Sequence, residues 1–161
     1  DERAYASCIL IGQTGAGKTH AVQQLCKYIK HCKNEPSFPR KLKDKSIYRL
    51  DLDQLEQGCS LFGQSEERRV KIVEFLKNNN GILFIDEFHK CASPRTDRNG
   101  NAISDLLEWM KPLMSQGDLC VIGATTKAEF KRYIFDPMSG GIGRAPIVGS
   151  YPFSTRKSIA A

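Results

Sequence analysis

The sequence lacks any long apolar stretch and any secretory signal pattern. No run approaches the ~20 apolar residues that a membrane-spanning helix needs, so we expect no such helix in this sequence. The first residues are charged and the one early apolar run is too short for a signal peptide. We therefore expect a protein of the cytoplasm with no membrane partner.

Closely spaced cysteine pairs are also missing. No two of the six cysteines have the C-x-x-C spacing typical of zinc sites. Cys8 and Cys120 lie inside apolar runs, where a thiol packs as a small hydrophobic group. His89 and Cys91 are neighbours in sequence, but two residues do not make a metal site. We expect all six cysteines to be reduced thiols.

One segment of the chain has few acidic residues. The formal net charge is +6, and residues 27–45 hold seven lysines or arginines against two acidic residues, a local net charge of +5. Such a segment either binds nucleic acid or an acidic partner, or is a solvated helix end and loop. Aromatic residues are not interleaved with these charges, and no known nucleic-acid-binding module accompanies them. We therefore favour the second interpretation and expect no nucleic-acid partner.

The chain does contain a regular alternation of short apolar runs and helical patterns. The predicted strands are 8–11, 46–52, 82–85 and 119–124, with a last short strand near Ile147. The predicted helices are 18–32, 65–77, 102–116 and 127–135. Apolar strands alternating with helices indicate an α/β fold, a parallel sheet of about five strands covered by helices on both faces.

A glycine-rich segment follows the first predicted strand and fits the pattern G-x-x-x-x-G-K-[ST] at every required position. Its residues are Gly12, Gln13, Thr14, Gly15, Ala16, Gly17, Lys18 and Thr19. Glycines let the backbone approach a phosphate closely, and the amides of the loop and of the following helix form an anion site. The segment therefore predicts a P-loop that binds a nucleoside triphosphate, with Lys18 on the β- and γ-phosphates and Thr19 on Mg²⁺.

Two acidic residues follow directly after the apolar strand 82–85. The carboxyl ends of parallel strands form the ligand-binding edge of such a sheet. Asp86 is placed there to hold Mg²⁺, and Glu87 to act as the general base that polarises the attacking water. The alternative, a strand that merely ends in polar turn residues, is disfavoured by the matching P-loop. Together the two motifs predict Mg²⁺-dependent ATP hydrolysis.

Two hydroxyl residues, Thr125 and Thr126, end the next apolar strand. At this edge a hydroxyl group is placed to contact the γ-phosphate or to position the attacking water. The same residues are equally well placed to cap the helix that begins at Lys127. The sequence pattern alone leaves these two interpretations open.

Four segments, in order, resemble the first ATPase module of Clp-type AAA+ proteins, the ClpB-like disaggregases and ClpA/ClpC-like unfoldases. They are GQTGAGKT at 12–19, ILFIDEFH at 82–89, MKPL with QGDL at 110–119, and IGATT at 122–126 with Glu129, Phe130 and Tyr133. The resemblance runs from about residue 8 to residue 148. It implies that residues 1–161 form one AAA+ large, nucleotide-binding subdomain, a fragment that lacks the small helical subdomain.

The resemblance also implies roles for individual residues. Thr125 and Thr126 would carry the γ-phosphate sensor, with Thr126 favoured. Arg144 lies where such modules keep the arginine finger that completes a neighbouring subunit's site in a homo-oligomeric ring, a hexamer in the family. Residues 61–63 (Leu-Phe-Gly) would fall in the loop that grips a threaded polypeptide.

The chain departs from the family pattern in two of these places. The family usually has two arginines preceded by Glu, where this chain has the single Arg144, and a tyrosine where this chain has Leu61 followed by Phe62. The prediction is an ATP- and Mg²⁺-dependent ring-shaped chaperone acting on unfolded or aggregated proteins. The departures leave an ATP-gated scaffold as an alternative, and the basic segment 27–45 leaves a DNA-acting loader as a weaker one.

Overall fold

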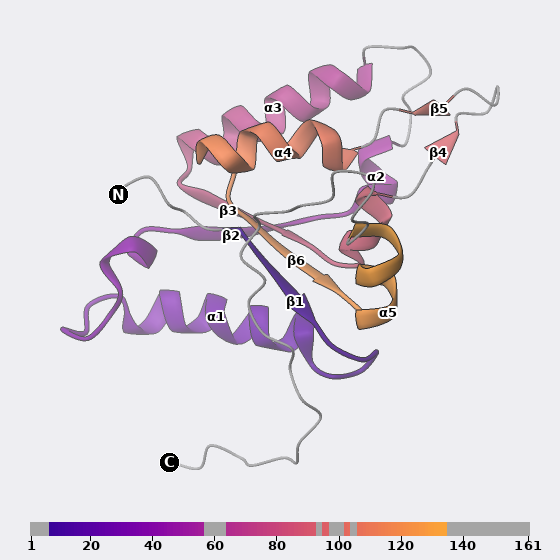
Figure 1. Ribbon diagram of the computed structural model, residues 1–161. Helices are drawn as coiled ribbons and strands as arrows, with labels where there is room; N and C mark the ends of the chain where they lie inside the picture. Colours follow the sequence, from indigo (N-terminus) through magenta and orange to yellow (C-terminus); the bar gives the residue numbers. More distant parts are fainter. Residues whose placement is uncertain (1–6, 57–63, 93–94, 97–101, 104–105, 135–161) are drawn as a thin grey trace.

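The fold is a parallel β-sheet with helices on both faces (Figure 1). The computed structural model describes residues 7–56, 64–92, 95–96, 102–103 and 106–134. Four parallel strands pair in the order β1-β6-β3-β2, with the bounds β1 Cys8–Ile11, β2 Ser46–Leu50, β3 Gly81–Ile85 and β6 Val121–Thr125. The predicted α/β class is confirmed, and the strand predicted near Ile147 lies outside the described residues.

Helices of different length cover the two faces of the sheet. α1 (Lys18–Cys32) lies on one face, and α3 (Gln64–Asn78) and α4 (Leu106–Gln116) lie on the other (Figure 1). Shorter turns follow the carboxyl ends of strands: α2 (Leu52–Glu56), the 3₁₀ turn η2 (Phe88–Cys91), and α5 (Lys127–Glu129). A further 3₁₀ turn, η1 (Arg40–Leu42), lies between α1 and β2. The first predicted strand and helix, 8–11 and 18–32, are confirmed residue for residue.

Several predicted elements have different bounds. β6 runs over Val121–Thr125 rather than 119–124, β3 begins one residue earlier than predicted, and α3 extends one residue further at each end. β2 stops at Leu50 rather than residue 52, because Asp51 Oδ1 accepts hydrogen bonds from the amides of Asp53 and Gln54 and so starts α2. The helix predicted over 127–135 is α5 only as far as Glu129 and continues as the wider turn η3 (Phe130–Ile134).

The start of the helix predicted over 102–116 is wrong. The helix begins at Leu106, and the residues before it include the short strand β5 (Ala102–Ile103). β5 pairs antiparallel with β4 (Arg95–Thr96), so its backbone groups are bonded between strands rather than within a helix. Residues 95 and 96, which lie between the predicted elements, therefore contribute a strand to this small second sheet.

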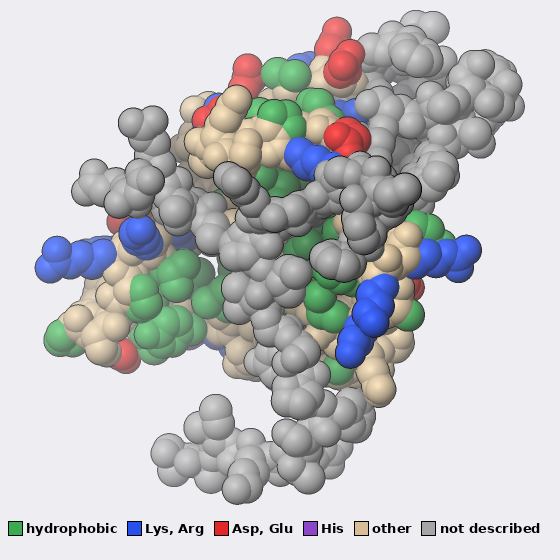
Figure 2. All heavy atoms as spheres, in the orientation of Figure 1, with side chains coloured by type: hydrophobic (Ala, Val, Ile, Leu, Met, Phe, Trp, Pro, Cys, Tyr) green, Lys and Arg blue, Asp and Glu red, His purple; other side chains and the backbone are tan. Residues whose placement is uncertain are grey.

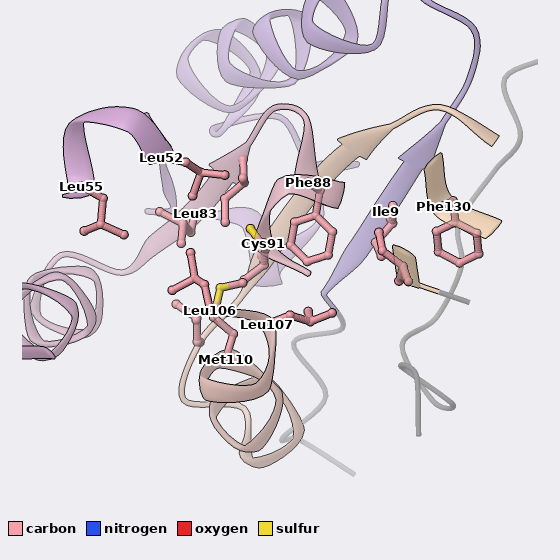
Figure 3. Close-up of a cluster of buried hydrophobic side chains, with 14 of the residues drawn as sticks. Ile9, Leu52, Leu55, Leu83, Phe88, Cys91, Leu106, Leu107, Met110 and Phe130 are labelled. Carbon is pink, nitrogen blue, oxygen red and sulfur yellow. The ribbon is translucent and has the colours of Figure 1, made fainter. Parts of the chain in front are cut away.

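The larger hydrophobic core lies on the face of the sheet that α3 and α4 cover (Figure 3). At its centre Ile85, Phe88 and Met110 are each 0% exposed. Full burial of such a side chain contributes about 1.5–3 kcal/mol to stability. Because Phe88 directly follows the two acidic residues at the end of β3, its burial fixes the turn that carries them.

A glycine on the neighbouring strand makes room for the Phe88 ring. A Cβ placed on Gly123 would lie 2.7 Å from Phe88 Cγ, closer than real Cβ contacts. The ring therefore packs directly against the backbone of β6. Close packing against Phe88 therefore explains why the IGATT segment has a glycine at this position.

The smaller core lies between the sheet and α1. It is formed by Val22, Ile82, Phe84, Ile122 and Ala124, and Cys8 and Cys120 pack against its edge. The prediction that these two cysteines act as small core hydrophobes is confirmed, and burial raises the pKa of both thiols. Among the described residues, the free cysteines are Cys8, Cys26, Cys32, Cys91 and Cys120.

The basic segment 27–45 lies at the end of α1 and in its connection to β2. Six of its seven basic side chains are exposed, and that of Lys45 is half-buried. Figure 1 shows the end of α1 and this connection at the left of the view, where Figure 2 shows projecting Lys or Arg side chains, whereas the P-loop lies at the other end of α1. The segment is therefore an exposed helix end and loop at a distance from the P-loop. None of the helices that the structure describes is long and apolar enough to cross a membrane.

Candidate nucleotide site

The predicted P-loop connects β1 to the start of α1. Gly15 and Gly17 have φ angles of 78° and 85°, a backbone region that glycine adopts without strain. Gly17 is the N-cap of α1, so no side-chain oxygen bonds the amides of the first turn, and that turn contains no acidic residue. These amides and the positive end of the helix dipole fit a bound phosphate.

Lys18 folds back over the P-loop. Its Nζ donates hydrogen bonds to the carbonyl oxygens of Gly12 and Gln13, both at 2.9 Å. The amide of Gly12 in turn donates to the carbonyl oxygen of Thr125 at 3.2 Å, which ties the loop to β6. The ammonium group is thereby held at the loop, where its positive charge adds to the anion site formed by the amides.

The two residues predicted to hold Mg²⁺ are brought together from positions 67 residues apart. Thr19 Oγ1 donates a hydrogen bond to Asp86 Oδ2 at 2.9 Å. The amide of Glu87 donates to Asp86 Oδ1 at 3.1 Å, which fixes the carboxylate. A hydroxyl and a carboxylate oxygen are ligands that Mg²⁺ takes. The donor set therefore fits this ion.

Glu87 stands beside Asp86 in an unusual backbone conformation. Its φ and ψ are 51° and 46°, in the left-handed region, which costs a non-glycine residue about 1–3 kcal/mol and is often found at active sites. Its side chain is 59% exposed, and Oε2 lies 2.5 Å from Lys90 Nζ. The carboxylate is thus accessible to water and able to accept a proton from it.

One cavity of about 490 Å³ brings these groups together, a size typical of small-ligand sites. Its lining includes Thr14, Gly15, Gly17, Lys18, Thr19, Asp86, Glu87, Thr125 and Thr126. Gly12, Gln13 and Ala16 belong to the loop but are not in the cavity wall. Arg144 and residues 61–63 lie outside the described residues.

The cavity wall also contains residues to which sequence reasoning gave no role. Arg49 and Glu129 line it directly. His89 reaches its edge through Thr125, because His89 Nδ1 lies 3.2 Å from Thr125 Oγ1. A capping-box pattern, Thr126 followed three residues later by Glu129, was visible in the sequence. No comparable local signal marks Arg49 or His89.

Glu129 joins the end of β6 to α5. Its Oε2 accepts hydrogen bonds from Thr126 Oγ1 at 2.8 Å, from the Thr126 amide at 3.2 Å and from Thr125 Oγ1 at 3.3 Å, while its own amide donates to Thr126 Oγ1 at 3.2 Å. His89 Nδ1 lies 3.2 Å from the same carboxylate oxygen. The capping interpretation is therefore confirmed for Thr126. Thr125 is 2% exposed and held by both Glu129 and His89.

These contacts predict a pH-dependent stability. Burial alone would raise the pKa of Glu129, but hydrogen bonds from Thr126, the nearby His89 imidazole and the Thr125 hydroxyl together lower it. A carboxylate with a lowered folded pKa stabilises the fold above its unfolded pKa, and this contribution is lost as the pH falls through the folded pKa. We expect Glu129→Gln to lower the free energy of unfolding at pH 7, and this deficit to shrink as the pH falls below about 4 and to disappear below the folded pKa of Glu129.

Urea unfolding of the two proteins across this pH range measures the deficit. Glu74→Gln, an exposed change in the middle of α3, is the matched control and should give a deficit near zero throughout. A Glu129→Gln deficit that does not change with pH would show that the ionised carboxylate does not stabilise the cap.

Comparison with known proteins identifies the family. Residues 8–134 match the family described as "AAA: ATPase family associated with various cellular activities". The "ATP-dependent Clp protease ATP-binding subunit ClpL" of Staphylococcus aureus (strain MRSA252) is 37% identical over 130 residues, 78% of this chain and 18% of that protein. The subunit ClpE of Lactococcus lactis subsp. lactis (strain IL1403) is 38% identical over 124 residues, 76% of this chain and 16% of that protein.

Solved structures agree with the sequence relatives. The S. cerevisiae Hsp104–ADP complex is 31% identical, with a TM-score of 0.62 over 81% of this chain and 21% of that one. A closed state of Hsp104 with ATPγS and FITC casein gives 31% identity and a TM-score of 0.61 over 79% of this chain and 20% of that one. The chain spans less than a fifth of the length of the two Clp relatives. The resemblance to Clp-type proteins is confirmed, and the chain belongs to the AAA family of ATPases.

Proposed function

We propose that this chain binds ATP with Mg²⁺ and hydrolyses it, as the nucleotide-binding subdomain of a Clp-type machine that remodels unfolded or aggregated proteins. The observation that carries the proposal is the 2.9 Å contact between Thr19 Oγ1 and Asp86 Oδ2, in the same cavity as the P-loop and Glu87. This arrangement joins a phosphate site, a pair of metal ligands and a general base.

In this proposal different residues of the chain bind the phosphates, hold the metal ion and activate the attacking water. The loop amides and Lys18 bind the phosphates, and Thr19 and Asp86 would hold Mg²⁺. The bound ion supplies positive charge that neutralises the phosphate oxygens. Glu87 accepts the proton of the attacking water, while Glu129 and His89 hold Thr125 at the cavity wall, where Thr125 or Thr126 senses the terminal phosphate.

The wider assembly is proposed from the relatives. Similarity to Hsp104, which has been solved with casein, supports a protein substrate. We assign the 1–161 chain to one large subdomain of a homo-oligomeric ring, with Arg144 as the finger for a neighbouring site and residues 61–63 as the substrate loop. Glu87, placed beside the metal ligands, favours hydrolysis over the ATP-gated scaffold.

The test is nucleotide binding and phosphate release with and without Mg²⁺. We expect calorimetry to detect ATP binding, and phosphate release to fall about 100-fold or more when EDTA removes Mg²⁺, because the ion is worth several kcal/mol to such reactions. Unfolded casein should raise the rate of release. A chain that does not bind ATP would refute the proposal, and casein-independent turnover would refute the protein substrate.

A further inference from the structure

An arginine, Arg49, lies on β2 at the wall of the nucleotide cavity. Side chains alternate between the two faces of a strand. Tyr48 and Leu50 pack against the larger core, and Ile47 packs against the smaller core under α1. Arg49 therefore shares the α1 face with Ile47, one step closer to the carboxyl end of the strand. At that point the face opens into the nucleotide cavity, which Arg49 lines.

The side chain of Arg49 is only loosely held. It is 65% exposed, and its Nη2 lies 3.9 Å from Asp86 Oδ2, at the limit of an ion pair. Among the residues that the structure describes, no other hydrogen bond or ion pair is seen for Arg49. An exposed pair of this length contributes little to stability. The guanidinium group is therefore free to turn toward a ligand in the cavity.

The position of Arg49 relative to Asp86 indicates which part of a nucleotide it would meet. Asp86 and Thr19 would hold Mg²⁺, which would supply positive charge at the phosphate end of a bound nucleotide. A cation beside Asp86 is thus at the phosphate end of the site. Lys18, the lysine in the same wall, donates hydrogen bonds to the P-loop carbonyl oxygens of Gly12 and Gln13. Arg49 has the planar donor group that binds phosphate oxygens in pairs.

We propose that Arg49 donates hydrogen bonds to the terminal phosphate of bound ATP from within the same chain, and so makes the site prefer a triphosphate to a diphosphate. This inference rests on the proposed nucleotide site. It differs from the role of an arginine finger, because Arg49 and the P-loop belong to one chain and need no neighbouring subunit.

The experiment measures affinities for ATPγS and ADP, both with Mg²⁺, by calorimetry on the full chain. Arg49→Ala should weaken ATPγS binding about 10- to 100-fold, the loss of one hydrogen bond between charged groups, and change ADP binding by less than about twofold. Arg49→Lys should restore part of the ATPγS affinity. Arg40→Ala removes the same charge from an exposed site in η1, outside the cavity wall, and should change neither affinity.

Each other result overturns the inference in a recognisable way. Equal losses of ATPγS and ADP affinity would mean that Arg49 does not read the terminal phosphate, and an Arg49→Ala protein that matches Arg40→Ala would mean that it contacts no phosphate. An effect that appears only at high protein concentration would place the arginine in a neighbouring subunit's site. In all three cases the proposed function still holds if the wild-type chain binds ATPγS and the Lys18→Ala variant does not. If the wild-type chain binds neither nucleotide, the proposed function fails as well.

Discussion

Replacing Glu87 with glutamine is expected to slow ATP turnover by a factor of about 10² to 10⁴ and to leave ATP affinity within about twofold. Glutamine has nearly the same shape as glutamate but cannot accept a proton from the attacking water. The side chain is 59% exposed, so the change leaves the core intact. Phosphate release at saturating ATP measures the rate, and calorimetry measures the affinity.

The matched control for this prediction is Lys90→Ala. Glu87→Gln removes a carboxylate and also weakens its ion pair with Lys90, whereas Lys90→Ala removes the ion pair and keeps the carboxylate. We expect the control to retain turnover within about tenfold of the wild type, since the carboxylate that accepts the proton is kept. If the two variants lose activity equally, the ion pair rather than the base accounts for the effect. Unchanged turnover in Glu87→Gln would mean that another group accepts the proton.

The second large effect is expected at Lys18. Lys18→Ala should weaken ATP binding about 10- to 100-fold, because it removes a charged donor from a site for a polyanion. The same change removes the hydrogen bonds to the Gly12 and Gln13 carbonyl oxygens, so the unfolding free energy is measured alongside the affinity. Calorimetric titration with ATP in the presence of Mg²⁺ gives the affinity directly.

Lys27→Ala is the control for Lys18. It removes the same charge from the same helix, but from an exposed position about three turns away from the P-loop. We expect its ATP affinity to match that of the wild type. If both variants bind ATP equally well, the P-loop lysine does not contact the nucleotide. If both bind weakly, the overall charge of α1 rather than contact by Lys18 determines the affinity.

The beginning of the fold was predictable because glycines mark the boundaries of its elements. The strand 8–11 ends where the P-loop begins. The helix starts directly after Gly17, because the left-handed backbone conformation of Gly17 is not helical. The region before α4 was not predictable in this way. Ala102–Ile103 is compatible with helix or strand by composition, and its strand conformation depends on pairing with Arg95–Thr96. Contacts between separate segments of the chain therefore determine the secondary structure of residues 102 and 103.

The same distinction applies to the site. The P-loop and the acidic pair can be found from the sequence because each motif is contiguous and its chemistry depends on residue type. Arg49 could not be found, because its position at the cavity follows from pairing between β2 and β3, in which Arg49 lies opposite Phe84. The link from His89 to Thr125 likewise requires β3 and β6 to be neighbours. Sheet order therefore determines the part of the site that the motifs leave out.

The missing side chain at Gly123 has a mechanical consequence. The Phe88 ring rests on bare β6 backbone, with no flexible atoms between them that could absorb a displacement. Interiors packed this closely transmit small shifts instead of damping them. The turn that carries Asp86 and Glu87 therefore cannot tilt without pushing on the strand that carries Thr125. The two acidic residues and the two threonines are therefore mechanically coupled through the packing of Phe88 against β6.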